Sequence, residues 1–165
     1  MPDKTSVIRP TDEQARLLAR QLLQSARYVS LAVLDPETGW PSVSRVLVAL
    51  DPSGVPFILV STLAAHTRSL LADPRCSFMA GEPGKGDPLA HARITVMALA
   101  EKVAQDAPER PQLRDIFLGH HPKSALYIDF PDFSFMRIIP QRASLNGGFG
   151  RAFNLDAADL CAPVA

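Results

Sequence analysis

A single arginine lies inside a strand-like run of small and apolar residues at positions 42–48. Alternation along a strand places Val43, Arg45 and Leu47 on one face. A guanidinium among apolar neighbours costs free energy unless it is paired, so Arg45 is expected to meet a carboxylate or a phosphate. A salt bridge to an acidic side chain, or an arginine that reaches solvent, explains the same pattern without a ligand.

Hydroxyl and basic side chains gather where another strand runs into a helix, just after Ser61. The first turn of a helix has free amides and the positive end of the helix dipole, which together favour a bound phosphate. Thr67 adds a hydroxyl donor to that turn, and His66 or Arg68 adds a further donor. The alternative is simple helix capping by Ser61 or Thr62, with the arginine in solvent.

A third basic position, Arg93, opens the run at residues 93–96, although an arginine at the start of a strand is usually surface charge. The chain has 17 Lys plus Arg and 17 Asp plus Glu, so its net charge is zero and any bound anion must be held by a local cluster. Arg45, the turn at residues 66–68 and Arg93 form such a cluster if the fold brings them together.

A glycine-rich segment, Asn-Gly-Gly-Phe-Gly, occupies residues 146–150. Its glycines permit a tight turn or a close approach of the backbone to a planar ligand. Phe149 and Arg151 are the side chains there that can touch a ring system. The segment lacks the GxGxxG spacing of a dinucleotide-binding loop, and a C-terminal turn without a ligand is the alternative.

The remaining reactive side chains match no common catalytic or metal motif. The four histidines are His66, His91, His120 and His121. They show neither HxxxH nor HExxH spacing, which argues against a zinc site. No GxSxG elbow supports a hydrolase, and Cys76 and Cys161 form no CxxC pair. We therefore expect no metal site, and no side chain stands out as a catalytic acid or base.

Length and composition indicate one globular domain over residues 1–165. Apolar residues make up 47% of the chain and charged residues 21%, which is ordinary for a folded protein. The zero net charge creates no field toward nucleic acid, and the apolar runs are far shorter than the roughly 20 residues of a membrane span. The N-terminus has no basic segment followed by an apolar core. We expect a cytoplasmic protein without nucleic-acid or membrane partners.

Turn signals divide the chain into short strands and a few helices. A capping box at residues 11–14, with Thr11 accepting from the third helical amide, predicts a helix up to Ser25. Strands are predicted at residues 28–34, 42–50, 56–61, 75–80, 92–103, 133–140 and 143–145. Helices are predicted at residues 63–72, 108–118 and 122–128. This order favours a small closed antiparallel barrel with peripheral helices, because closure removes exposed strand edges.

Several of these pieces resemble, in order, the pyridoxamine 5′-phosphate oxidase-like FMN-binding split-barrel superfamily. They are the strand at 41–47, the Asp-Pro-Ser-Gly turn at 51–54, the segment 61–70, the Asp-Pro-Arg turn at 73–75 and the strand at 93–96. The Asp132-Phe133 pair and the closing Gly-Gly-Phe-Gly-Arg-Ala at 147–152 are similar to the heme-utilisation branch of that superfamily. The likeness covers a core of about residues 11–153.

The resemblance implies a mainly β fold, a six-stranded antiparallel split barrel, and a homodimer with two FMN sites at the subunit interface. Arg45 falls on the family's strand arginine, and the next two residues would contact the isoalloxazine edge through backbone groups. His66 and Thr67 fall on the paired phosphate-binding positions. With Arg68 added from the helix turn, the expected cofactor-binding residues are Arg45, Val46, Leu47, Ser61, His66, Thr67, Arg68 and Arg93.

Three functions fit this picture. The main hypothesis is an FMN-dependent oxidoreductase, in which the flavin supplies the redox chemistry and the protein orients it. The alternative is a heme-binding or heme-utilisation protein on the same barrel, with His66, His120 or His121 as the iron ligand. A flavin-binding protein without catalysis is the third. The heme-utilisation branch has a C-terminal histidine as its iron ligand, and this chain has no histidine after His121.

Overall fold

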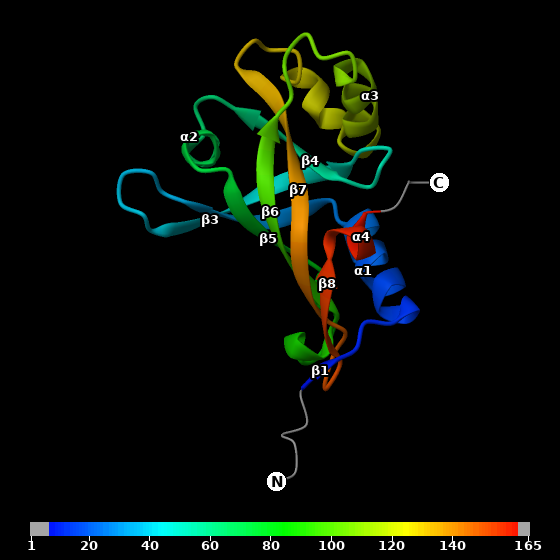
Figure 1. Cartoon of the computed structure of the whole chain (residues 1–165). Helices are drawn as coiled ribbons and strands as arrows, with labels where there is room; N and C mark the ends of the chain where they lie inside the picture. Colours follow the sequence, from blue (N-terminus) through cyan, green and yellow to red (C-terminus); the bar gives the residue numbers. More distant parts are fainter. Residues whose placement is uncertain (1–6, 162–165) are drawn as a thin grey trace.

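The computed structural model describes residues 7–161 and shows six strands closed into an antiparallel barrel (Figure 1). The barrel strands are β2 (Tyr28–Leu34), β3 (Pro41–Leu50), β4 (Pro56–Ser61), β5 (Arg75–Ala80), β6 (Arg93–Lys102) and β7 (Phe133–Asn146). Their order is β7-β4-β3-β2-β5-β6, and a further pairing between β6 and β7 closes the barrel. The predicted mainly β barrel with peripheral helices is confirmed.

The turn residues explain why several strands begin and end where the sequence predicts. β2, β4 and β5 match their predicted bounds, because Asp-Pro turns flank them. In the turn between β3 and β4, the Asp51 carboxylate accepts from the amides of Ser53 and Val55. Gly54 follows with a φ of 81°, a left-handed conformation that favours glycine. This turn directs the chain straight back into an antiparallel pair.

Alternate side chains fill the barrel, as the period of a strand requires. On β2, Val29, Leu31 and Val33 are buried, whereas the residues between them are partly exposed. The interior cluster takes further apolar residues from β3, β4, β5, β6 and β7 and from α1 (Glu13–Ser25). Burial of these side chains is the main favourable contribution to folding.

A second hydrophobic cluster lies outside the barrel, beneath α3 (Arg110–His120) and the 3-10 helix η2 (Pro122–Leu126). The rings of Phe57, Phe117 and Phe135 form its centre, with centroids 5.5 to 5.9 Å apart. The other short helices are α2 (Ala65–Ala72), η1 (Pro88–Ala90) and α4 (Ala157–Leu160). Within residues 7–161, no helix is long and apolar enough to cross a membrane.

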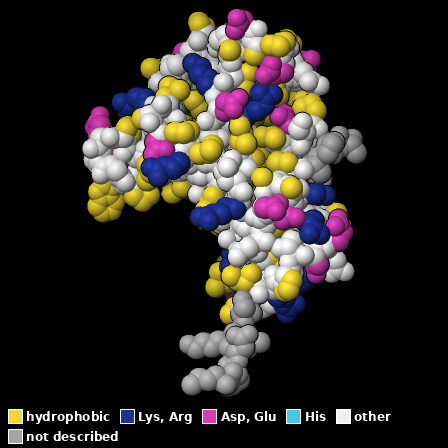
Figure 2. All heavy atoms as spheres, in the orientation of Figure 1, with side chains coloured by type: hydrophobic (Ala, Val, Ile, Leu, Met, Phe, Trp, Pro, Cys, Tyr) yellow, Lys and Arg dark blue, Asp and Glu magenta, His cyan; other side chains and the backbone are white. Residues whose placement is uncertain are grey.

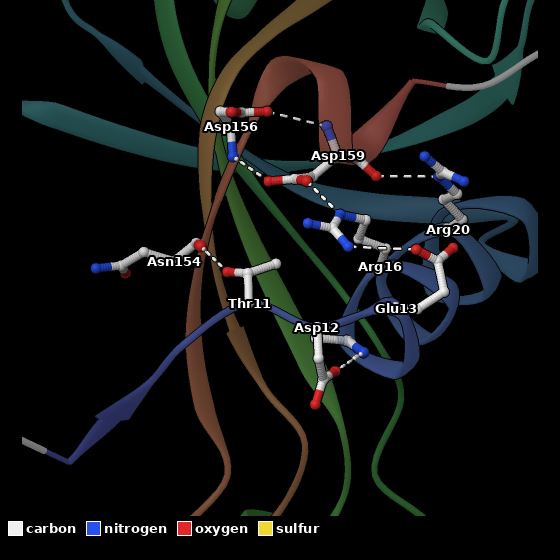
Figure 3. Close-up of polar contacts among 9 residues, drawn as sticks. Thr11, Asp12, Glu13, Arg16, Arg20, Asn154, Asp156 and Asp159 are labelled. Atoms are coloured by element: carbon white, nitrogen blue, oxygen red, sulfur yellow. Dashed lines mark hydrogen bonds and ion pairs between the residues drawn. The ribbon is translucent and has the colours of Figure 1, made fainter.

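The predicted capping box at the start of α1 is wrong by one residue. Asp12 is the N-cap, and its carboxylate accepts from the Ala15 amide at 2.8 Å. The Thr11 hydroxyl instead donates to the carbonyl oxygen of Asn154, 143 residues away along the chain (Figure 3). Local spacing could not reveal so distant a partner for Thr11. Because aspartate is as good an N-cap residue as threonine, Asp12 takes the role predicted for Thr11.

The C-terminal third differs most from the prediction. β7 is one strand of 14 residues rather than two, because a bulge opposite Met97 and Ala98 accommodates Pro140 and Gln141 within it. The glycine-rich segment leads into β8 (Ala152–Asp156), which pairs with β7 and was not predicted. A short parallel strand, β1 (Ile8–Arg9), completes the sheet beside β8.

A polar clasp ties the C-terminal helix α4 to α1 (Figure 3). Arg16 on α1 bonds the Asp159 carboxylate through Nε at 2.6 Å, and Arg20 donates to the Asp159 carbonyl oxygen at 3.0 Å. Asp159 and Asp156 also cap each other's amides in a reciprocal capping box. One carboxylate therefore serves both a helix start and a contact between two chain segments far apart in sequence.

Replacing Asp159 with alanine is expected to lower the free energy of unfolding by about 1–2 kcal/mol, because it removes a cap and a half-buried ion pair together. The matched control is Glu13→Ala, since Glu13 pairs with the same Arg16 at 3.2 Å but is 80% exposed. That control should change stability by less than about 0.5 kcal/mol. Urea unfolding of both variants measures the difference, and equal effects would show that the clasp adds nothing beyond a surface pair.

Candidate functional site

One edge of β3 is left open where the barrel splits. Residues 41–47 of β3 pair with β2, whereas β4 pairs with β3 only at residues 48–50 and then continues beside β7. The outer half of β3 is therefore paired with β2 alone, and beyond the residues of β2 that pair with β5 the two strands project from the barrel as an arm (Figure 1). Among the described residues, the second edge of this arm has no strand partner. Backbone groups of Arg45, Val46 and Leu47 that face this edge can bind a ligand.

The first turn of α2 lies beside this open edge. Ser44 on β3 contacts His66 on α2, with 3.4 Å between Oγ and Nδ1. Arg45 and Thr67 are the next residues along each element, so the fold brings together the two segments that the sequence singled out separately. The open edge of β3 and the first turn of α2 together form the candidate site.

The hydroxyl groups expected to bind a phosphate are already engaged within the chain. Thr67 is buried, and its hydroxyl donates to the carbonyl oxygen of Ser61 at 2.6 Å. The Ser61 hydroxyl donates to the Asp132 carboxylate at 3.2 Å. Since phosphate oxygens need donors, these two hydroxyls have no proton left for one. The backbone amides of Ala65 and His66 remain without a partner among residues 7–161.

His66 is the titratable group of this site. Its ring is half-buried, and desolvation lowers its pKa below the ordinary 6.5. The ring is therefore neutral at pH 7. Nδ1 faces the Ser44 hydroxyl, whereas Nε2 has no hydrogen-bond partner among the described residues. A neutral imidazole that has a partner at one nitrogen and none at the other is the form that coordinates a metal.

Arg45 lies on the outer face of β3 and is exposed. The sequence led us to expect a carboxylate or a phosphate beside it, but its guanidinium instead covers the ring of Tyr28 at 5.0 Å. Glu82 accepts a hydrogen bond from Tyr28 and so raises the pKa of that phenol. None of the ion pairs in the described part of the chain involves Arg45. The aromatic face orients the guanidinium and leaves its N–H groups free for an anion.

The other two predicted arginines lie apart from each other. Arg68 is exposed on α2 close to Asp35, whose pKa is lowered first by backbone amides and also by this positive charge. Arg93 opens β6, and β2 and β5 separate it from β3. Its guanidinium donates to the carbonyl oxygens of Leu89 and His91. Within one chain, Arg93 therefore does not join the site formed by β3 and α2.

The other histidines are placed less favourably than His66 for binding a ligand at this site. His121 is buried, and its Nε2 bonds the Val48 carbonyl oxygen at 2.8 Å. His91 uses Nε2 on the carbonyl oxygen of Lys85. His120 is exposed at the end of α3, away from α2. Residues 7–161 contain no cluster of three or more His, Cys, Asp or Glu side chains placed to hold a metal ion.

The glycine-rich segment forms the turn between β7 and β8. The Gly147 amide donates to the Arg151 carbonyl oxygen at 2.7 Å, and Phe149 is 73% exposed. β7 starts opposite Ser61 and runs 14 residues before this turn, so the turn lies at the other end of the strand from α2 (Figure 1). In one chain the segment does not reach the site.

Sequence reasoning missed three residues of the site. Ser44 carried a weak signal, since alternation placed it on the opposite face from Arg45. Tyr28 and Glu82 carried none, because Tyr28 on β2 meets the arginine on β3, and Glu82 reaches Tyr28 from the loop after β5. The open edge itself follows from where β4 leaves β3, which is a property of the closed barrel and not of any short segment.

Comparison with known proteins supports the same fold. A non-canonical chloroplastic heme oxygenase, HOZ, of Arabidopsis thaliana is 37% identical over 115 residues, or 70% of this chain, and the match spans only 34% of that relative. The heme oxygenase HutZ of Vibrio cholerae is 27% identical over 147 residues, 86% of this chain and 81% of the relative. A solved heme binding protein from Mycobacterium smegmatis has 34% identity and a TM-score of 0.81, covering 93% of this chain and 61% of that one.

A more distant structure shows how far the fold extends. A protein of the pyridoxinephosphate oxidase family from Clostridium acetobutylicum is 14% identical with a TM-score of 0.68, covering 91% of this chain and 99% of that one. The predicted resemblance to that superfamily and to its heme-utilisation branch is confirmed. Residues 10–160 match the family described as CREG, beta-barrel, so the chain belongs to the CREG beta-barrel family.

Proposed function

We propose that this protein binds heme at the site formed by the open edge of β3 and the first turn of α2, with His66 as the iron ligand. Relatives named as heme oxygenases or heme binding proteins support the ligand class. The observation that carries the proposal is the state of His66, a half-buried neutral imidazole on the first turn of α2, whose Nε2 has no hydrogen-bond partner among the described residues. No other histidine of the described residues combines these properties.

The residues around His66 suit the rest of a heme molecule. A porphyrin needs apolar surface for its ring and cations for its two propionates. Leu63, in the turn before α2, is apolar and 85% exposed. Arg68 is an exposed cation on α2, and Arg45 is an exposed cation beside the open edge of β3, on the face opposite Ser44. When bound, heme would supply the redox-active iron; the chain's own residues would orient it and neutralise its carboxylates.

An FMN-binding oxidoreductase is the second candidate. The unpaired edge of β3 and the free amides of Ala65 and His66 suit the polar edge of a flavin and its phosphate. The Ser61 and Thr67 hydroxyls, however, donate within the chain, which removes two of the donors expected for that phosphate. Heme has no phosphate that needs these hydroxyl donors, and we rank it first for that reason.

A second copy of the chain would complete the surface, and we propose a homodimer. The outer face of the barrel carries five large apolar side chains in adjoining rows, each between 38% and 67% exposed. They are Val43 and Leu47 on β3, Met79 on β5, and Met97 and Leu99 on β6. Apolar side chains that gather on one sheet face mark an interaction surface rather than ordinary exposure.

Titration of the purified protein with hemin and, separately, with FMN tests the proposal. Hemin is expected to give a Soret band with 1:1 binding per chain, and FMN to bind more weakly. Arg45→Glu should weaken hemin binding about 10-fold, because it places a carboxylate near a propionate. Lys123→Glu on η2 is the charge-matched control and should leave affinity unchanged. Saturable FMN binding without a Soret band would refute the heme proposal and support the second candidate.

A further inference from the structure

The only tryptophan of the chain stands at the end of the β2–β3 arm. Trp40 is 74% exposed. The turn that presents it is tightly built: the Asp35 amide donates to the Trp40 carbonyl oxygen at 2.9 Å, and the Gly39 amide donates to the Asp35 carbonyl oxygen at 2.8 Å. Amides of Thr38 and Glu37 bond the Asp35 carboxylate and lower its pKa. An ordered turn thus presents a large aromatic side chain to solvent.

The arm carries this ring away from the body of its own chain. Figures 1 and 2 show the arm projecting from the barrel, with hydrophobic side chains gathered at its outer end. The arm is also continuous with the apolar outer face described above, because Trp40 directly precedes β3 and Val43 lies near the start of that strand. An exposed tryptophan on a rigid projection is typical of an anchor that fills a pocket on a partner.

The same outer face contains a mostly apolar groove that suits the Trp40 ring. Its volume is about 420 Å³, and it runs across β2, β5, β6 and β7. Apolar or small side chains line most of it, including Val33, Met97 and Leu99. Burial raises the pKa of the Cys76 thiol to about 11, so this lining residue is uncharged. Arg75 also lines the groove and pairs with Asp73 at 2.6 Å; apart from Arg75 and Arg142 the lining side chains are uncharged, and the groove is large enough for an indole.

One cation, Arg142, stands at the rim of the groove without a carboxylate. The bulge in β7 turns both Gln141 and Arg142 outward. The Arg142 Nε contacts Met97 Sδ at 3.0 Å, and no carboxylate of the described residues pairs with it. Asp156, opposite in the β7–β8 register, is occupied with the cap of α4. A guanidinium beside an apolar floor is suited to an aromatic face.

We propose that Trp40 of one copy docks in this groove of a second copy, with its ring against Arg142. The inference rests on the proposed homodimer and names the contact that holds it. In a two-fold dimer the contact forms twice, because each chain supplies one arm and one groove. Trp40 is therefore an anchor of the interface and not part of the heme site, so the contact forms with or without heme.

Sedimentation and tryptophan fluorescence of the heme-free full chain test this inference. Wild-type protein is expected to dimerise with blue-shifted emission, and dilution to monomer should shift the emission toward that of exposed tryptophan. Trp40→Ala should raise the dimer Kd by about 10-fold or more. Arg142→Glu should do the same and also red-shift the emission. Because one tryptophan gives the whole signal, the shift reports this ring alone.

Two controls match these variants. Leu126→Ala removes an apolar side chain of similar exposure, 78%, on η2, and Lys123→Glu makes the same charge change there. Both should keep the dimer Kd within about 2-fold of wild type. A monomeric wild type, fully exposed Trp40 emission in the dimer, or a Trp40→Ala dimer as tight as wild type would each overturn the inference. None of these readouts involves heme, so failure of the heme proposal would appear only in the hemin titration.

Discussion

Replacing Asp51 with alanine should lower the free energy of unfolding by about 3 kcal/mol, at the lower end of what is lost when one partner of a buried ion pair is removed. Asp51 is 5% exposed and bonds Arg137 at 3.1 Å. It also holds the β3–β4 turn through the amides of Ser53 and Val55. Its loss leaves a largely buried guanidinium with one partner fewer and a turn without its acceptor. Urea unfolding measures the change.

The structure offers a control on the same arginine. Glu109 bonds the other side of Arg137 at 3.1 Å, but its side chain is 38% exposed. Glu109→Ala should therefore destabilise the protein clearly less than Asp51→Ala does, because exposed pairs contribute little. Asp51→Asn keeps an acceptor for the turn and removes the charge, so its loss should fall between the two. If Asp51→Ala and Glu109→Ala destabilise equally, burial is not what makes Asp51 important.

Much of the barrel could be predicted because its signals are local. Asp-Pro turns with glycine mark the ends of β2, β4 and β5, and alternating apolar residues predict their buried faces. β8 and α4 escaped because they are short and depend on distant partners. Arg16 and Arg20 on α1 hold α4 through Asp159, and no sequence window contains both ends of that contact.

The candidate site was predicted in part, because some residue types indicate a function by their position alone and others do not. Arg45 and His66 stood out because a cation in a strand and a histidine in a helix's first turn are unusual by themselves. The engagement of Ser61 and Thr67 could not be predicted, since a hydroxyl serves a cap and a ligand equally well until its acceptor is known. Asp132 settles that choice for Ser61 from 71 residues away.

Replacing His66 with alanine should weaken hemin binding by about 100-fold and shift the Soret band of what remains bound. Even the hydrogen-bond partners of metal ligands account for roughly 10- to 100-fold in metal affinity, and removal of the ligand itself should cost at least as much. Ser44→Ala, which removes the group facing Nδ1 at 3.4 Å, should weaken binding about 10-fold by the same rule. Hemin titration followed by absorbance measures both variants.

Two histidines serve as controls for this prediction. His120 is exposed on α3, and His91 bonds the Lys85 carbonyl oxygen, so alanine at either position removes an imidazole away from the site. Both variants should bind hemin as wild type does. An unchanged Soret band in His66→Ala would remove His66 as the ligand, and a lost band in His120→Ala would move the site to the end of α3.

The pH dependence of binding separates a ligand from a bystander. Iron binds neutral imidazole. Desolvation lowers the pKa of His66 below 6.5, so at neutral pH iron does not have to displace a proton from the His66 ring. Protonation at lower pH competes with iron. Hemin affinity should therefore be constant above pH 6.5 and fall only as the pH drops through the lowered pKa. This histidine-dependent fall should be absent in His66→Ala, whereas a wild-type fall that persists unchanged in that variant would place the titrating group elsewhere.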